Sequence, residues 1–205
     1  MHPPSLHRPM SISDVPRWDF ETDVAIIGFG ATGACAAIEA RDAGAKVILF
    51  ERNSGSGGAS GLSGGEIYIG GNGGTEVQRA AGFDDTTEAF TSYLKMAGGP
   101  CADEAKCEVY GAEALHHWEW LKAQGVPYKG SYLPGKHIEP TGDDTLIWSG
   151  SEAAVPFYDS ATPAPRGHVI QFMGWGGGRK LVDILEARAR ALGAQIEVDA
   201  RAVAL

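Results

Sequence analysis

The sequence that most constrains the architecture of this chain reads Asp23-Val24-Ala25-Ile26-Ile27-Gly28-Phe29-Gly30-Ala31-Thr32-Gly33. Its first five residues form a short apolar run rich in β-branched side chains, which is typical of a fully buried parallel strand. An alanine-rich helix is expected to follow to about Ala43 and to end at Gly44, and residues 46–50 form a second apolar run. The stretch therefore predicts a complete βαβ unit and an α/β fold with a parallel sheet and packed helices.

The turn after the first strand carries the pattern Gly-x-Gly-x-x-Gly, which is informative here because a strand precedes it and a helix opens inside it. Gly28 makes the tight turn, Gly30 lets a pyrophosphate approach the backbone, and Gly33 lets the helix pack against the strand. The free amides of the first helical turn, among them those of Ala31 and Thr32, would face the pyrophosphate at the positive end of the helix dipole. The pattern predicts a Rossmann-like dinucleotide-binding domain.

An acidic residue, Glu51, ends the second strand, close to the expected distance of about 20 residues from the glycines. Its carboxylate can accept hydrogen bonds from both ribose hydroxyls of an adenosine. Where a 2′-phosphate is bound, an arginine usually takes this place, so Glu51 disfavours NADP.

A second glycine-rich run, residues 54–65, follows Glu51 directly, where a nicotinamide-binding domain would continue with another helix crossover. A second glycine-rich segment would let the backbone approach a second part of the cofactor, which suits FAD because its flavin lies well beyond the pyrophosphate. Backbone amides, among them that of Gly64, and the hydroxyls of Ser60 and Ser63 can bond the phosphates, the ribityl chain and the flavin edge near N5. A flexible Gly/Ser linker is the alternative, which the position directly after Glu51 disfavours. We therefore predict FAD.

Composition excludes several classes of partner. The net charge is −9, the pI is about 5.1, and no run of Lys and Arg exists, so nucleic acid is a poor partner. No apolar stretch approaches the roughly 18 residues that span a bilayer, and residues 1–17 lack the apolar core of a secretory signal. The three cysteines form no Cys-x-x-Cys pair. We expect reduced thiols and a cytoplasmic protein.

Outside the βαβ unit the pattern is less regular. Residues 66–69 can pair as a short strand, and Asp85 with Glu88 three residues later indicates a capping box in which Asp85 accepts from the Glu88 amide. We expect helices from there to about residue 96, over 102–124 and over 179–192, and a last strand over 195–198. Residues 126–178 hold six of the eleven prolines and show little periodicity, which predicts a long segment without regular structure.

Several motifs together resemble a known group of flavoproteins. The motifs Glu51-Arg52, Gly58-Ala59-Ser60 and Ser63-Gly64-Gly65 look like the fumarate reductase and 3-ketosteroid dehydrogenase superfamily. Later motifs are most similar to its bacterial steroid-ring dehydrogenases, the delta-4-(5-alpha) type first and the delta-1 type next: Gly70-Gly71, Gly82-Phe83-Asp84-Asp85, Gly125-Val126-Pro127-Tyr128-Lys129, Tyr158-Asp159 and Ala164-Pro165-Arg166-Gly167-His168. The similarity runs from Trp18 to Leu205.

The resemblance implies a set of residues that contact FAD: Gly28, Gly30, Gly33, Glu51, Arg52, Gly58, Ala59, Ser60, Ser63 and Gly65. It also implies that the backbone of Ala202 meets the adenine. Enzymes of this family oxidise a CH–CH bond next to a ketone: a tyrosine phenolate removes a proton and a hydride passes to flavin N5. Their catalytic tyrosines and substrate cap come largely after position 205, so the resemblance assigns no catalytic residue here.

From these observations we expect a disordered tail over residues 1–17 and an FAD-binding domain over residues 18–205. This domain would be the N-terminal part of a larger flavoprotein, without the substrate cap. Alone it is expected to expose a large apolar face, to bind FAD weakly and to be inactive. The electron acceptor and the oligomeric state stay open.

Other candidates exist within the chain. His116 and His117 with Glu113 could be read as a metal site, but adjacent helical histidines point in different directions, so we expect no metal. Asp143-Asp144 fits a solvated turn better than an acid–base pair. Possible substrate contacts are Tyr128, Tyr132, Tyr158 and His168, and packed or surface side chains are the alternative for each. The competing functional hypotheses are a non-catalytic FAD-binding module or fragment, and a fumarate reductase-type flavoprotein acting on a small dicarboxylate.

Overall fold

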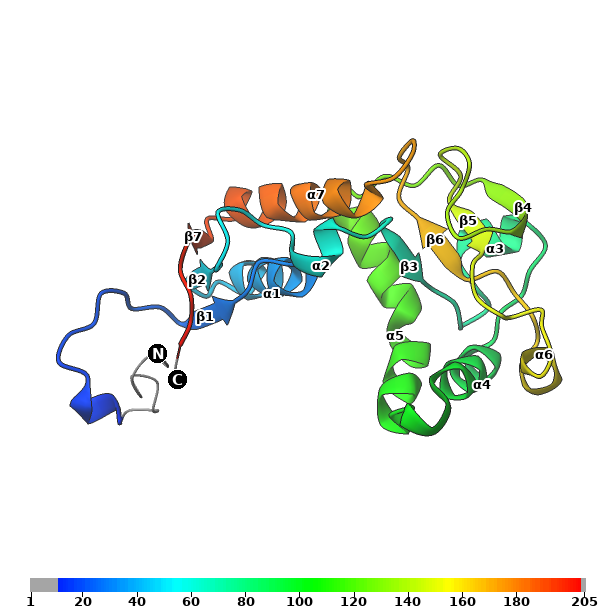
Figure 1. Cartoon of the computed structure of the whole chain (residues 1–205), viewed down its shortest axis with the longest axis horizontal. Coiled ribbons are helices and arrows are strands. Elements are labelled where there is room, and N and C mark those ends of the chain that lie inside the picture. Colours follow the sequence, from blue (N-terminus) through cyan, green and yellow to red (C-terminus); the bar gives the residue numbers. More distant parts are fainter. Residues whose placement is uncertain (1–10, 204–205) are drawn as a thin grey trace, which may run out of the picture. The chain divides into compact units, whose positions relative to one another are not determined.

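The computed structural model of the chain describes residues 11–203, which divide into two compact units (Figure 1). Unit 1 comprises residues 11–61 and 182–203, and unit 2 comprises residues 62–181. The chain therefore builds part of unit 1, then the whole of unit 2, and then returns to complete unit 1.

Unit 1 contains a three-stranded parallel sheet. Its strands are β1 (Val24–Ile27), β2 (Val47–Phe50) and β7 (Gln195–Glu197), in the order β1-β2-β7. Helix α1 (Ala31–Asp42) connects β1 to β2, and Gly44, with φ of +88°, follows its end in the left-handed conformation that glycine adopts easily. The βαβ unit predicted from the sequence is confirmed.

Strand β1 differs from its prediction as a fully buried strand. Ile26 is buried, but the side chain of Ile27 is 55% exposed and Ala25 is exposed as well. Side chains alternate between the faces of a strand, so exposed Ala25 and Ile27 share one face while buried Ile26 lies on the other; among the described strands, β1 is paired with β2 alone. An apolar run shows that a segment can be buried, but it does not place that segment at the centre of a sheet.

Helix α7 (Gly177–Ala191) completes unit 1 with its later turns (Figure 1). Buried Val182, Leu185 and Ala189 recur at spacings of three and four, which gives this part of the helix one apolar face. The end of α7 is tied to α1, because Arg41 donates from Nε to the carbonyl of Leu192 at 2.8 Å. Ahead of β1, the described part of the expected tail contains one 3-10 turn, η1 (Ile12–Asp14), with no buried residue.

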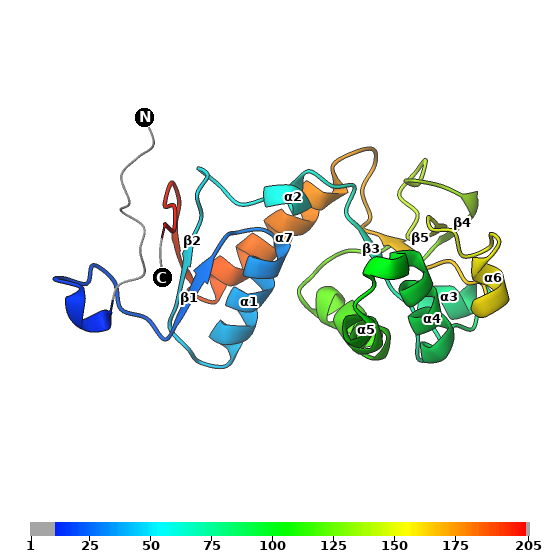
Figure 2. The same ribbon diagram turned by 60° about the horizontal axis from the view of Figure 1, so that its bottom comes forward.

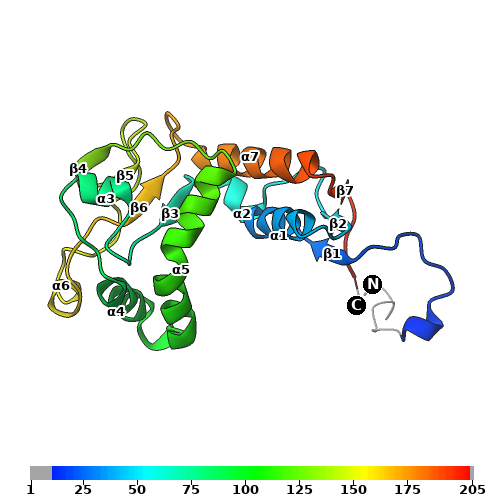
Figure 3. The same ribbon diagram turned by 180° about the vertical axis from the view of Figure 1, so that it is seen from behind.

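Unit 2 contains a four-stranded mixed sheet in the order β3-β6-β5-β4 (Figure 3). The strands are β3 (Glu66–Tyr68), β4 (Tyr132–Lys136), β5 (Leu146–Trp148) and β6 (Gly167–Val169). β6 is antiparallel to both of its neighbours, and β4 is parallel to β5. The short strand predicted over 66–69 is confirmed. The expectation that residues 126–178 lack regular structure is wrong, because three of the four strands come from them.

The remaining helices are short, apart from two in unit 2. They are α2 (Gly58–Gly61), α3 (Glu76–Ala80), α4 (Thr87–Gly98), η2 (Gly99–Cys101), α5 (Glu104–Ala123) and α6 (Phe157–Ser160). Helices α4 and α5 pack on each other (Figure 2), and Phe90 and Trp118 carry them into a core shared with Ile69 and Leu146. No helix among the described residues has both the length and the apolar character needed to cross a membrane.

The helix caps correct one prediction. Asp85 does not cap α4: the cap is Thr86, whose side chain accepts from the Ala89 amide at 3.1 Å. The complete capping box lies at α3 instead, where Thr75 accepts from the Gln78 amide and the Gln78 side chain accepts from the Thr75 amide. The Thr-x-x-Gln spacing of this box can be read from the sequence. Asp85 does not cap a helix because its carboxylate binds Arg166, far along the chain.

Candidate cofactor-binding site

The turn between β1 and α1 is shaped by its glycines. Gly28 has φ of +96°, and its amide donates to the carbonyl of Phe50 at 2.8 Å, which joins the turn to β2. Gly30 is the N-cap of α1 and has no side chain with which to cap the helix. The amides at this end have no acceptor within the helix, so they and the helix dipole favour an anion in front of the turn.

Gly30 and Gly33 are glycines for different physical reasons. A Cβ at Gly33 would lie 2.0 Å from the carbonyl oxygen of Gly28, so the contact between helix and turn itself requires glycine there. A Cβ at Gly30 would meet Gly57 and Ser60 only at 3.6 and 3.7 Å, which is ordinary contact. Its φ of −87° is also accessible to any residue. Nothing in the described protein demands glycine at position 30, whereas a molecule lying on the turn would demand it.

Glu51 is a buried acceptor beside this turn. It is 6% exposed, and its carboxylate accepts from the backbone amides of Phe29 and Asn53, each at 2.7 Å. Burial raises the pKa of this carboxyl, but the amides of Asn53 and Phe29, together with the charge and the amide of Arg52, outweigh burial and hold the pKa below its ordinary value. The group is therefore ionised at neutral pH, and each oxygen keeps a lone pair with which to accept a hydroxyl.

A cavity of about 370 Å³ opens between the glycine turn, the end of β2 and the segment after β7. The segment is held in place because the Ala200 amide donates to the carbonyl of Glu51 at 2.9 Å. The cavity brings together several predicted residues with some that the prediction missed: Ile27, Gly28, Phe29, Gly30, Phe50, Glu51, Arg52, Asn53, Gly58, Ala200, Arg201 and Ala202. An ionised acceptor and a helix N-terminus at one cavity suit a nucleotide.

The first part of the glycine-rich run returns to α1. The Gly57 amide donates to the carbonyl of Phe29 at 2.8 Å, and the Ser60 hydroxyl accepts from the Ala31 amide at 3.4 Å. Gly58 has φ of +54°, a conformation that other residues rarely adopt. Short helix α2 thus brings Gly58, the exposed Ala59 and Ser60 to the N-terminus of α1, where backbone amides are available. Thr32, in the first turn of α1, is exposed as well.

The second part of the run lies in unit 2 and has a structural explanation of its own. The Gly178 amide donates to the carbonyl of Ser63 at 3.0 Å. A Cβ at Gly65 would lie 2.5 Å from the backbone of Gly177, and one at Gly177 would lie 2.3 Å from the carbonyl of Gly64. The close approach of these two backbone segments accounts for the glycines. A flavin contact by Ser63, Gly64 and Gly65 stays a prediction.

The steroid-branch motifs around Asp85 and Arg166 lie in the interior of unit 2. Arg166 donates to the Asp85 carboxylate from two nitrogens, at 2.8 and 2.6 Å, and both side chains are fully buried. The guanidinium also lies 5.4 Å from the ring centre of Phe90. A Cβ at Gly70 would lie 2.2 Å from Asp85. These motifs therefore hold unit 2 together.

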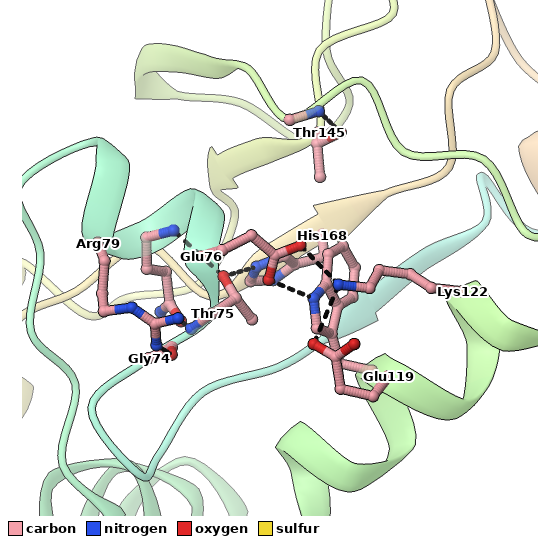
Figure 4. A network of polar contacts seen from close by, with 11 residues as sticks. Gly74, Thr75, Glu76, Arg79, Glu119, Lys122, Thr145 and His168 are labelled. Carbon is pink, nitrogen blue, oxygen red and sulfur yellow. Dashed lines mark hydrogen bonds and ion pairs between the residues drawn. The ribbon is translucent and has the colours of Figure 1, made fainter.

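His168 is a fully buried core residue (Figure 4). Its Nδ1 donates to the carbonyl of Arg166 at 2.9 Å, and its Nε2 lies 2.9 Å from the Thr75 hydroxyl, from which the neutral ring accepts. The ring also meets Trp118 edge-on, with centroids 4.8 Å apart. Burial lowers the pKa of His168 to about 4, so the imidazole is neutral at pH 7.

The other candidate side chains are mostly engaged within unit 2. Tyr132 accepts from the indole of Trp148 at 2.7 Å, and Tyr128 packs on Trp118 with ring centroids 4.1 Å apart. Tyr158 is half exposed. His116 pairs with Glu113 at 2.7 Å on the exposed side of α5, and His117 stacks instead on Trp120. Asp143 pairs with Lys129, and Asp144 accepts from the Ser131 hydroxyl.

Comparison with known proteins shows which family the chain resembles. Residues 23–205 match the family described as FAD binding domain. The chain is 39% identical over 171 residues to the 3-oxo-5-alpha-steroid 4-dehydrogenase of Comamonas testosteroni, which covers 80% of this chain and 31% of that protein. The resemblance drawn from the motifs is confirmed.

Solved structures give the same picture. The crystal structure of 3-ketosteroid-delta4-(5alpha)-dehydrogenase from Rhodococcus jostii RHA1, in complex with 4-androstene-3,17-dione, matches with a TM-score of 0.89 and 46% identity, over 94% of this chain and 40% of that chain. A flavocytochrome c3 fumarate reductase in its open conformation matches with a TM-score of 0.66 and 26% identity, over 87% and 26%. The chain spans about a third of the length of the curated relative. It belongs to the FAD binding domain family of flavoproteins, and its cofactor is FAD.

Proposed function

We propose that this chain is the cofactor-binding part of an FAD-dependent oxidoreductase that dehydrogenates a CH–CH bond next to a ketone, in a 3-oxosteroid-like substrate. The observation that carries the nucleotide site is the cavity of unit 1, where ionised Glu51 lies beside the N-terminus of α1, whose N-cap is Gly30. The substrate class is supported by the activities for which the two relatives are named, at 39% and 46% identity. We assign residues 18–205 to one FAD-binding domain, with unit 2 inserted between the two segments of unit 1.

In this proposal the residues of unit 1 hold the adenosine diphosphate half of FAD. Glu51 accepts from the ribose hydroxyls, and the backbone around Ala202 meets the adenine. The amides at the start of α1 bind the pyrophosphate over Gly30, assisted by Gly58, Ala59 and Ser60. Arg201 and Asn53, which line the same cavity, are additional contacts. FAD, when bound, supplies the hydride acceptor at flavin N5.

The remaining predicted residues serve the flavin half. We propose that Ser63, Gly64 and Gly65 lie along the flavin edge, and that Arg52 contacts FAD at the mouth of the cavity. The proton-abstracting group is not assigned to this chain. The cytoplasmic location inferred from composition stays a prediction.

Reduction of the flavin tests the proposal. The purified oxidoreductase that contains this chain is mixed anaerobically with a 5α-reduced 3-oxosteroid, without any other electron acceptor, and bleaching of the flavin absorbance is followed. Bleaching by the steroid is expected. A protein that binds FAD but is not reduced by any ketosteroid would contradict the substrate class. Fumarate with reduced flavin is the second arm, because the flavocytochrome c3 match favours a dicarboxylate as the alternative.

A further inference from the structure

The segment between β2 and α2 carries cofactor-binding residues but has little intrinsic order. Residues 51–57 form no helix or strand, and Gly55 has no neighbour within 4 Å of where a side chain would begin. Gly57 and Gly58 have φ values of +143° and +54°. Fixing such a backbone costs about 1–2 kcal/mol of conformational entropy per residue. Contacts with the rest of unit 1 must therefore define the loop.

Backbone contacts fix its two ends. The amide of Asn53 donates to Glu51, and its carbonyl accepts from the Asp199 amide at 3.0 Å. At the other end the Gly57 amide donates to the carbonyl of Phe29 at 2.8 Å. Between these ends the chain passes through three small residues, including Gly55.

The middle of the loop is tethered by a side chain of α7. The Ser56 hydroxyl donates to Oε2 of Glu186, and Arg190, one turn later on α7, donates from Nε to Oε1 of the same carboxylate at 2.8 Å. Glu186 is therefore held from both sides, and its side chain is only 23% exposed. A hydrogen bond to an ionised acceptor is stronger than a neutral one, so this tether is suited to fixing a loop without regular structure.

We infer that Glu186 is a positioning residue for the cofactor site, acting through Ser56. This inference rests on the nucleotide site proposed above. Glu186 does not line the cavity; it fixes the loop that presents Gly58 and Ser60 to the pyrophosphate end of α1. A loop that is already ordered loses less conformational entropy when the ligand binds. Loss of the tether should therefore weaken the binding of ligands that contact the proposed pyrophosphate site. A ligand held at Glu51 alone is little affected.

The test compares Glu186→Ala, Glu186→Gln and Ser56→Ala in the flavin-free protein. The Kd values of FAD, ADP and adenosine are measured by titration calorimetry, and the melting temperature of each variant is measured without ligand. Glu186→Ala and Ser56→Ala should each weaken FAD and ADP by about tenfold, the scale of one hydrogen bond to a charged group. Adenosine should change by less than about twofold, and Glu186→Gln, which keeps an acceptor, should recover most of the affinity.

The double variant decides whether both residues act through one contact. Ser56→Ala with Glu186→Ala should be no weaker than either single change, because the tether is lost only once. Asp183→Ala, an exposed acid on α7, is the matched control and should bind FAD as the wild type does. Ser56→Ala keeps the test valid if Glu186→Ala fails to fold.

Three outcomes would overturn the inference: wild-type FAD affinity in both single variants, additive losses in the double variant, or an equal loss for adenosine and ADP. Wild-type protein that binds no FAD would overturn the proposed site and this inference together. Wild-type protein that binds FAD, with unaffected variants, would overturn the inference alone.

Discussion

Unit 1 and unit 2 both bury charged side chains, but these side chains have different kinds of partner. In unit 2, Asp85 and Arg166 bind each other with two hydrogen bonds inside the core. In unit 1, Glu51 binds two backbone amides and keeps acceptor capacity beside a cavity. A charge paired with an opposite charge in the core serves stability, whereas a charge that still faces open space can serve a ligand.

Glycines divide into the same two kinds, although Gly33 of unit 1 belongs with those that the fold requires. At Gly70 and Gly65 an added side-chain atom would collide with the protein, while at Gly30 it would find room. Motif glycines therefore do not share one meaning. The space beside each glycine separates those that the fold requires from those that a bound molecule requires.

The largest expected effect tests the buried ion pair of unit 2. Asp85→Ala leaves Arg166 charged and buried without its partner, which should lower the free energy of unfolding by about 3–5 kcal/mol. Asp143→Ala is the control, because its pair with Lys129 lies at the surface and its loss should lower the free energy of unfolding far less. Urea unfolding measures both. Equal losses in the two variants would remove the distinction between the pairs.

Acid should destabilise the protein through His168. Its folded-state pKa, about 4, lies below the ordinary 6.5, so its contribution is complete above pH 6.5 and is lost as the pH falls toward 4. The loss from this group is up to about 3 kcal/mol. Urea midpoints measured between pH 7 and 4 should fall less steeply in His168→Asn than in wild type. Identical slopes in the two proteins would contradict the burial argument.

Glu51→Ala should weaken cofactor binding and also lower the stability of the flavin-free protein, because the amides of Phe29 and Asn53 lose their acceptor. The charged acceptor for ribose is lost, so FAD binding should weaken by about 1.5–3 kcal/mol. Flavin fluorescence measures the Kd, and the unfolding of the flavin-free protein measures its stability. An unchanged Kd would remove Glu51 from the proposed site.

The two glycines of the turn give the sharpest matched pair. Gly33→Ala places an atom against the Gly28 carbonyl and should destabilise the flavin-free protein by about 1–3 kcal/mol. Gly30→Ala should leave that stability unchanged but weaken FAD, and the bulkier Gly30→Val should give a colourless protein. A yellow Gly30→Val protein with stoichiometric flavin would show that nothing lies on this turn.

The sequence predicts unit 1 well because its signals are local. Two apolar runs, a glycine turn and an acid at the end of β2 suffice to place α1, β1 and β2. Most of the cavity follows from the same residues, since Gly28, Gly30 and Glu51 belong to one βαβ unit. Arg201 and Asn53 were missed because nothing in their neighbourhood marks them.

Unit 2 is harder to predict because its determinants are distant in sequence. Strand β4 reads Tyr132-Leu133-Pro134-Gly135-Lys136. Proline and glycine are uncommon inside strands, so this sequence does not predict a strand that pairs with β5. Asp85 has the local signature of a helix cap, and only its contact with Arg166, 81 residues later, reveals its role. A pattern of neighbouring residues cannot predict a contact between residues so far apart in the sequence.

The discontinuity of unit 1 has a consequence for how the chain is made. On the ribosome β1, α1 and β2 emerge first, but β7, the neighbour of β2, is synthesised only after all of unit 2. The β2–β7 pairing thus closes a very long loop, a non-local contact of the kind that slows folding. The closure penalty grows by only about 0.6 kcal/mol per doubling of loop length, and a unit 2 that has already folded shortens the flexible span. Translation order therefore favours assembling the inserted unit first and completing the nucleotide cavity last, when residues 200–202 arrive.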